Sequence, residues 1–217
     1  GHYEDIRYPV STMSLSGGLS PNWSVYKNDG GGSYIGDAVL FNGTNNIVIP
    51  SGAGHKFNNT SFTIAFWMRT NQVDTNTHSI ILHKGNGGQP NWEVGIYRNR
   101  LYFIMSSIGT VTTSDRDIIY GKRTCIFLTC LLTGGKSLFK IYVDNVLSMQ
   151  YYFNNSPTDG NVTVYIGSDA SGNNYYNGVL DELRLWNSGA LDSYASTYYN
   201  NGLGTETPEG TEVGWHM

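Results

Sequence analysis

The chain has 217 residues, a formal net charge of −4 and only 14% charged residues, well below the quarter that is typical of globular domains. Its 27 Gly and 16 Tyr favour a turn-rich β protein with a neutral, polar surface. No run of basic residues is present, which argues against nucleic acid and anionic membranes as partners. No apolar run reaches the 18 residues typical of a membrane-spanning helix, so we expect no membrane insertion.

The first 35 residues are rich in Gly and Ser and contain one possible strand near 23–26. We expect this N-terminal segment, 1–35, to be part of the same sandwich as the residues that follow. Its first residues, GHYEDIRY, are polar and do not resemble a signal peptide.

Strand patterns then recur every 8 to 15 residues along the chain. In 61–70, Phe62, Ile64, Phe66 and Met68 alternate with Thr63, Ala65 and Trp67, which is the period of a strand. Turn residues with a tolerance for positive φ separate several of these strands, at Gly134-Gly135 and Asp144-Asn145. The expected strands lie near 37–43, 46–50, 61–70, 79–85, 92–105 (a hairpin), 124–152 (three strands), 161–168 and 178–186.

One short helix is expected near the C-terminus, over 191–199. Its apolar stripe is Leu191, Tyr194, Ala195 and Tyr198, with Ser188 or Asp192 as a possible cap and Gly202 as the stop. Many strands with one short C-terminal helix predict an all-β fold, a two-sheet antiparallel β-sandwich. We expect 205–217 to be a C-terminal tail or an edge strand.

The two cysteines, Cys125 and Cys130, lie five residues apart in one expected strand. An offset of five places them on opposite faces, roughly 16 Å apart, whereas a disulfide needs Cα atoms within about 7 Å. We therefore expect two free, buried thiols.

The order of several motifs resembles the laminin-G-like jelly-roll domains of the concanavalin A-like lectin/glucanase superfamily. The motifs are GDAVLFNG, IVIP, SFTIAFWMRT, IYVDNVL, VYIGSD, YYNGVLDELRLWNSGALD and YYNNG, and they span 36–204. The chain departs from the family in reading GKRTCIFLTC where a Trp-His-His stretch is common, and in closing a hairpin with Asp144-Asn145 instead of Asp-Gly. The resemblance implies a jelly roll, and because the superfamily holds both lectins and glycosidases it does not fix the ligand.

The segment GVLDELRLW, 178–186, raises the question of a buried charge. Strict alternation would place Val179, Asp181, Leu183 and Leu185 on its more apolar face. A carboxylate there needs a partner. One candidate is calcium, which takes oxygen ligands, and the resemblance implies a structural Ca²⁺ held by Asp181 together with Asp37, Asn42 and Gly43. The alternative is that Asp181 accepts backbone hydrogen bonds or pairs with an arginine.

A ligand-binding surface is expected in the loop SDASGNNYYNG, 168–178. Its amides can bind sugar hydroxyls and its aromatic rings can stack on sugar rings; a plain turn-rich loop is the alternative. Trp92 in the neighbouring sheet could also contact a ligand, although a strand tryptophan more often lies in the core. The candidate ligand-binding residues are Asp169, Asn173, Asn174, Tyr175, Tyr176 and Trp92.

Catalysis is not expected, because a glycosidase needs two suitably spaced carboxylates and the chain has no Glu-x-Asp-x-x-Glu run. The leading hypothesis is a non-catalytic carbohydrate-binding or cell-surface recognition module whose partner is a glycan or a glycosylated surface. The alternative is a structural or adhesive domain of a viral, phage or bacterial surface assembly that contacts protein. Both hypotheses place the chain outside the cell, at a cell surface or at a virion surface.

Overall fold

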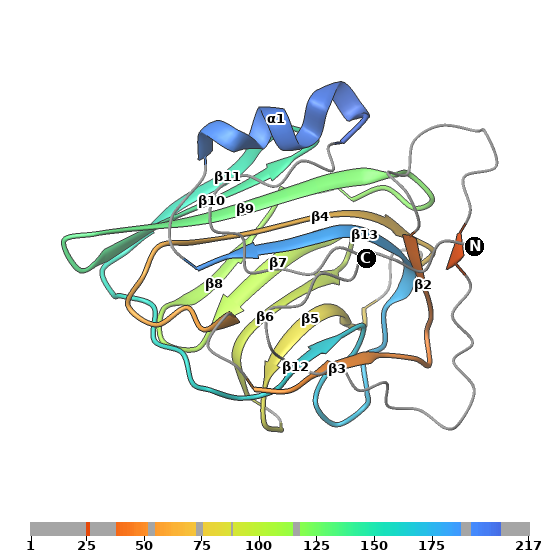
Figure 1. Ribbon diagram of the computed structural model, residues 1–217, viewed down its shortest axis with the longest axis horizontal. Coiled ribbons are helices and arrows are strands. Elements are labelled where there is room, and N and C mark those ends of the chain that lie inside the picture. Colours follow the sequence, from red (N-terminus) through yellow and green to blue (C-terminus); the bar gives the residue numbers. More distant parts are fainter. Residues whose placement is uncertain are drawn as a thin grey trace.

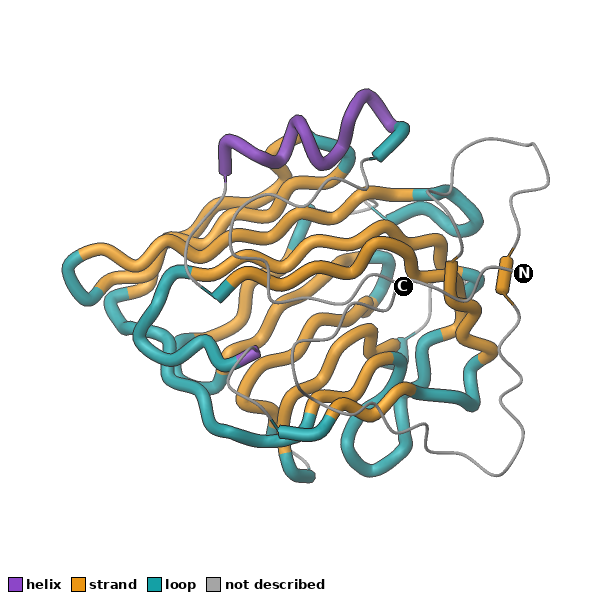
Figure 2. Tube along the Cα trace, in the orientation of Figure 1, coloured by secondary structure: helices purple, strands orange, loops and turns teal. Residues whose placement is uncertain are grey.

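Two antiparallel sheets face each other in the computed structural model of the protein (Figure 1). The structure describes residues 38–51, 55–72, 76–87, 89–114, 118–187 and 192–204, and the backbone of 25–26. Strands account for most of this chain, as the orange segments of Figure 2 show. The expected β-sandwich with one short helix is therefore confirmed.

The first sheet has seven strands. Their order is β1 (Val25–Tyr26), β2 (Ala38–Asn42), β13 (Asn177–Trp186), β4 (Phe62–Thr70), β9 (Thr124–Thr133), β10 (Lys136–Val143) and β11 (Val146–Phe153). The short strand β1 lies within the segment 23–26 in which the sequence predicts one.

The second sheet has six strands. Their order is β3 (Ile47–Ile49), β12 (Val164–Ile166), β5 (Ser79–Gly85), β6 (Pro90–Tyr97), β7 (Arg100–Met105) and β8 (Gly109–Thr112).

The core lies between the two sheets and takes alternate residues from most strands. In β4, Phe62, Ile64, Phe66 and Met68 join this inter-sheet core, while Ala65 and Trp67 point to the outer face. This is the alternation that the sequence predicts for 61–70. Each such side chain contributes about 1.5–3 kcal/mol when fully buried, so the core holds the two sheets together.

The helical segment covers part of the outer face of the seven-stranded sheet (Figure 1). A 3₁₀ turn (Asp192–Tyr194) leads into helix α1 (Ala195–Tyr199), and a second 3₁₀ turn (Asn200–Gly202) follows. Tyr194, Ala195 and Tyr198 are buried as expected, whereas Leu191 and Ser188 lie outside the described residues. Asp192 does not cap the helix; its carboxylate accepts a hydrogen bond from Thr129 Oγ1 at 2.6 Å and pairs with Lys140.

The helix ends at Tyr199 as expected, but a different residue stops it. Asn200, with φ 45°, is the left-handed cap residue, so α1 ends before Gly202. In the described residues, no helical segment has the length and hydropathy that a membrane-spanning helix requires.

Strand β13 contains a β-bulge that breaks the alternation expected for it. Its register against β4 shifts between Asp181 and Arg184, and Glu182 adopts a positive φ of 51°. As a result, Leu180, Leu183 and Leu185 share the inter-sheet core. The prediction that Asp181 shares a face with Leu183 and Leu185 is therefore wrong, because a bulge inserts one extra residue and reverses the faces beyond it.

The cysteines occupy opposite faces of β9, as their spacing predicts. Cys125 packs in the outer cluster under α1 and Cys130 in the inter-sheet core. Both are free and buried. Burial raises the pKa of the Cys125 thiol well above its usual range and that of Cys130 to about 12.

Candidate functional site

Two of the residues expected to hold calcium, Asn42 and Asp181, are not brought together. Asp181 is fully buried and pairs across the sheet with Trp67, whereas Asn42 pairs with Asn177, four positions away along β13. Four residues of extended strand span about 13 Å, which is far beyond a calcium–oxygen distance of 2.3–2.6 Å. Asp37 lies outside the described residues.

The turn after β2 uses its polar groups internally. Asn42 Oδ1 accepts hydrogen bonds from the backbone N–H of Thr44 at 3.0 Å and from its hydroxyl at 2.8 Å. Gly43, at φ 84°, donates its N–H to the Tyr176 carbonyl. Among the residues that the structure describes, no group of three His, Cys, Asp or Glu side chains could hold a metal. Asn42 and Asp181 therefore lie too far apart to share one ion, and the calcium site as a whole stays a prediction.

Asp181 instead belongs to a buried charged cluster beneath the helix. Trp67, its cross-strand partner, contacts the helical segment, and paired residues of neighbouring strands share a face. The next residue, Glu182, pairs with Arg184. Tyr198 of α1 donates its hydroxyl to the Glu182 carbonyl at 2.6 Å. The cluster thus ties α1 to the bulge of β13.

The loop between β12 and β13 is organised around Asp169, and we refer to 168–175 as the Asp169 loop. Asp169 Oδ1 accepts hydrogen bonds from the backbone N–H groups of Ser171 (2.9 Å) and Asn173 (2.8 Å). Its other oxygen accepts one from Asn174 Nδ2 at 3.0 Å. These bonds give the loop a defined shape.

The Asp169 loop is also fastened to β5. Ile80 donates its N–H to the Asn174 carbonyl at 2.8 Å and forms a bridge with Tyr175. Asn173 and Asn174 are exposed and Tyr175 is half-buried. The loop therefore presents amides and one aromatic ring in an ordered arrangement beside the start of β5.

Two residues expected to contact a ligand lie in the core instead. Tyr176 is fully buried, with its ring against Phe41 at 6.0 Å between centroids. Trp92 is also fully buried and stands 5.2 Å from the ring of Phe57. Their side chains cannot reach a ligand at the surface, so these two assignments are corrected.

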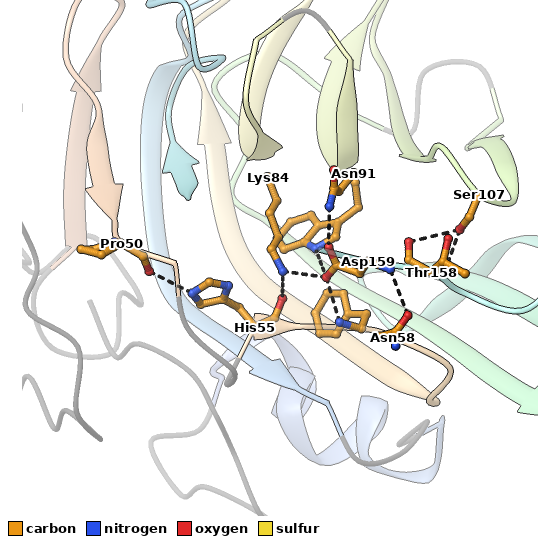
Figure 3. A network of polar contacts seen from close by, with 10 residues as sticks. Pro50, His55, Asn58, Lys84, Asn91, Ser107, Thr158 and Asp159 are labelled. Carbon is orange, nitrogen blue, oxygen red and sulfur yellow. Dashed lines mark hydrogen bonds and ion pairs between the residues drawn. The ribbon is translucent and has the colours of Figure 1, made fainter. Parts of the chain in front are cut away.

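Asp159 is the centre of a network of polar contacts (Figure 3), in which Trp92 takes part. Asp159 Oδ2 accepts bonds from Trp92 Nε1 at 3.2 Å, Lys84 Nζ at 2.7 Å and Phe57 N at 2.8 Å. Its Oδ1 accepts one from Asn91 Nδ2 at 3.1 Å. The Lys84 and Asp159 side chains are both fully buried.

This Asp159 network fixes the segment after β11 to β5, β6 and 55–57. Lys84 Nζ also donates to the His55 carbonyl at 2.9 Å. Burial lowers the pKa of Lys84, and hydrogen bonding to Asp159 opposes that change. The network is inaccessible to a ligand and is a structural anchor; the sequence offers only an isolated Lys in a strand and an Asp-Gly turn as signals for it.

A second polar group on the six-stranded sheet links β5, β6 and β7. His83 Nδ1 lies 2.7 Å from Glu93 Oε2, and Tyr102 donates its hydroxyl to Glu93 Oε1 at 2.7 Å. Burial and the Glu93 charge raise the pKa of Tyr102 well above its ordinary value, so this hydroxyl stays protonated and donates. Glu93 is thereby engaged as an acceptor by two neighbours.

The hairpin between β6 and β7 forms an exposed corner. We define the Arg98 corner as Asn76, His78, Tyr97 and Arg98. The rings of His78 and Tyr97 stack at 4.6 Å between centroids with an interplanar angle of 18°. The Arg98 guanidinium carbon lies 5.2 Å from the Tyr97 ring centroid, and Arg98 Nε donates to Asn76 Oδ1 at 2.8 Å.

The Arg98 corner and the Asp169 loop are neighbours at the start of β5. The Asp169 loop is bonded to Ile80, and His78 precedes Ile80 by two residues, about 7 Å along an extended chain. Amides, stacked rings and the Arg98 guanidinium therefore lie near the start of β5.

Solved structures with the same fold include binding domains of bacterial toxins. The binding domain of Paraclostridial Mosquitocidal Protein 1 matches with a TM-score of 0.67 and 14% identity, over 88% of this chain and 48% of that one. Botulinum neurotoxin type C, whose cell entry is described as dependent on two ganglioside molecules, matches with a TM-score of 0.64 and 14% identity, over 90% and 47%. This chain spans about half the length of these structures.

A sugar-bound domain of an enzyme also shares the fold. Domain 4 of the extracellular arabinanase AbnA from Geobacillus stearothermophilus, in complex with arabinotriose, matches with a TM-score of 0.58 and 17% identity, over 90% of this chain and 88% of that domain. No curated protein sequence matches at a significant level. The family model described as the concanavalin A-like lectin/glucanases superfamily matches residues 41–193, which is most of the 217-residue chain. The chain therefore belongs to the concanavalin A-like lectin/glucanases superfamily.

Proposed function

We propose that this chain is a non-catalytic carbohydrate-binding module that contacts a glycan, or a glycosylated surface, through the Asp169 loop. The observation that carries the proposal is the ordered loop itself: Asp169 fixes the backbone at Ser171 and Asn173. Exposed amides in a fixed geometry can exchange hydrogen bonds with sugar hydroxyls without a large loss of conformational entropy on binding.

The structural neighbours agree with this choice. One is a domain bound to arabinotriose, and others are toxin binding domains. The absence of a paired-carboxylate run in the sequence supports a non-catalytic role, because glycoside hydrolysis uses two carboxylates. We place the module outside the cell, at a cell surface or a virion surface.

The test is a broad glycan array followed by calorimetry with the best glycan. Asn173→Ala removes one exposed amide, and Tyr175→Ala removes the aromatic ring of the loop. Each should weaken binding by about five- to tenfold, as expected for one lost hydrogen bond or ring contact of about 1 kcal/mol. Asn154→Ala, an exposed Asn after β11, is the matched control and should bind like the wild type.

Two results would contradict the proposal. One is an array on which the wild type binds no glycan. The other is glycan binding that both loop variants retain at full strength, which would place the site elsewhere on the sandwich.

A second candidate is a protein contact within a surface assembly. The outer face of the seven-stranded sheet carries the cross-strand row Leu131, Leu138 and Tyr152, of which Leu131 is 41% and Tyr152 63% exposed. Exposed apolar side chains in a row are typical of protein interfaces. A stable trimer in solution that Tyr152→Ser disrupts would favour this function.

A further inference from the structure

We propose that the Arg98 corner binds the carboxylate of an acidic sugar, so that the module selects acidic over neutral glycans. This inference rests on the proposed carbohydrate-binding function and names the chemical class of its ligand. It concerns residues outside the loop that the sequence singles out.

The backbone at Arg98 is unfavourable for the residue that occupies it. Arg98 and Asn99 have φ values of 51° and 61° and form the two-residue turn between the paired residues Tyr97 and Arg100. Such turns need positive φ at both positions and favour Asn, Asp and Gly. An Arg in this conformation is uncommon and strained.

The other two-residue hairpins of the described chain use suitable residues. Gly134 and Gly135 have φ values of 58° and 77°, and Asp144 and Asn145 have 49° and 63°. Arg98 is thus the exception at an exposed turn. Strain of this kind is frequent at ligand-binding positions, and here it places a guanidinium at the tip of the hairpin.

The guanidinium of Arg98 is held in a defined plane. Its Nε donates to Asn76 Oδ1 at 2.8 Å, and its carbon lies 5.2 Å from the centroid of the Tyr97 ring. Within the described part of the chain, Nε makes the one hydrogen bond of this side chain, and the side chain is exposed, which leaves its two terminal nitrogens for a ligand. Two parallel N–H groups match the two oxygens of a carboxylate.

The aromatic rings beside Arg98 provide an apolar surface for a sugar ring. His78 stacks on Tyr97 and meets the edge of Tyr102 at 5.2 Å between centroids. His78 is exposed and Tyr97 half-buried, so the pair offers apolar surface next to a cation. An acidic sugar combines a ring that packs on such a surface with a carboxylate that pairs with the Arg98 guanidinium.

Other anionic partners fit this corner less well. Nucleic acid recognition uses several cations along a basic stripe, and the chain carries a net charge of −4. The oriented Arg98 guanidinium, with aromatic rings and amides beside it, instead matches one charged group on an otherwise neutral ligand.

The test compares acidic glycans with a neutral glycan, using the full chain. The probes are 3′-sialyllactose, a galacturonic acid tetrasaccharide and lactose, measured by calorimetry at 50 mM and 500 mM NaCl. At 50 mM NaCl we expect one of the acidic probes to bind at least tenfold more tightly than lactose. The ratio should fall at 500 mM, because salt screens an exposed charge pair. The two acidic probes distinguish a sialic acid from a uronic acid as the source of the carboxylate.

Arg98→Gly is the decisive variant, because glycine relieves the positive φ and keeps the turn. We expect it to abolish the acidic preference while its Tm equals or exceeds that of the wild type. Arg98→Lys keeps the charge without the fork and should recover only part of the preference. The control is Lys136→Gln, which removes an exposed cation at the hairpin between β9 and β10 and should leave the preference intact.

The outcomes separate this inference from the proposed function. Lactose binding that Asn173→Ala weakens, together with no acidic preference, would overturn the inference alone. An acidic preference that survives Arg98→Gly would also overturn it. Failure of every glycan to bind would overturn both.

Discussion

The contribution of an ion pair to the stability of this protein depends on how deeply the pair is buried. Asp159 and Lys84 are fully buried and form one ion pair, whereas Asp192 and Lys140 form another with side chains that are 33% and 21% exposed. A buried charge depends on its partner because water cannot replace it. An exposed pair contributes little because solvent screens it.

Asp159→Ala should therefore lower the free energy of unfolding by about 3–5 kcal/mol, since it leaves the Lys84 ammonium buried without its counter-ion. Asp192→Ala, the matched control, should cost about 1 kcal/mol or less. Denaturation in urea measures both values. Equal losses in the two variants would contradict the structural role assigned to the Asp159 network.

A second residue-scale prediction concerns acid stability. Burial, assisted by the Lys84 charge, lowers the pKa of His55 from 6.5 to about 4. Between these pH values the unfolded chain binds a proton that the folded chain does not, so stability falls as the pH drops from 6.5 towards 4, by up to about 3 kcal/mol.

The contribution of His55 to acid sensitivity can be isolated from the slope of the free energy of unfolding against pH. His55→Gln should flatten the dependence of the free energy of unfolding on pH between 4 and 6.5, whatever its effect at neutral pH. An unchanged slope would mean that other groups cause the acid sensitivity.

At the scale of elements, the short helix α1 is held by packing and not by its own hydrogen bonds. It spans only Ala195–Tyr199, too short to be stable alone. Tyr198 is fully buried, contacts Phe127 at 5.7 Å between ring centroids and bonds to the Glu182 carbonyl.

Tyr198→Ala should accordingly destabilise the protein by about 3–5 kcal/mol, as large-to-small core substitutions of aromatic residues do. Tyr198→Phe keeps the ring and loses only the hydrogen bond, so it should cost about 1–3 kcal/mol. Thr197→Ala, at an exposed position of the same helix, should change the Tm little. A Tyr198→Ala variant as stable as Thr197→Ala would show that α1 does not contribute to the fold.

At the scale of the whole molecule, the register of β2 on β13 separates two of the predicted calcium ligands, Asn42 and Asp181. Strands β2 and β13 do pair. Asn42, however, pairs with Asn177, which lies four residues from Asp181 along β13. We therefore expect that Ca²⁺ and a chelator give the same Tm for the wild type.

Asp181→Asn should destabilise the protein equally in calcium and in chelator, because its carboxylate belongs to the charged cluster beneath α1. A wild-type Tm that rises in calcium, together with a variant that loses the rise, would restore the calcium site. A ligand that binds only the folded state raises the free energy of unfolding, by about 2.7 kcal/mol at a hundredfold excess over Kd, and the Tm rises with it.

The sequence by itself determined the fold class, most strands, the hairpins and the free cysteines. These features depend on local periodicity and turn chemistry, such as the alternation of Phe62, Ile64 and Phe66 or the glycines at 134–135. It also identified the Asp169 loop, because Asn, Asp, Gly and Tyr gather there within a few residues.

Only the tertiary structure decided which side chains are accessible and which way β13 faces. Trp92 is buried and donates a hydrogen bond to Asp159, which lies 67 residues away in the sequence. A bulge at Glu182 decides which residues of β13 face the core. A glutamate rarely adopts a positive φ, so the sequence does not predict this bulge. Arg98 is recognised as strained only once its φ and its partner Asn76 are known. Contacts between distant residues fix these features, and local patterns do not contain them.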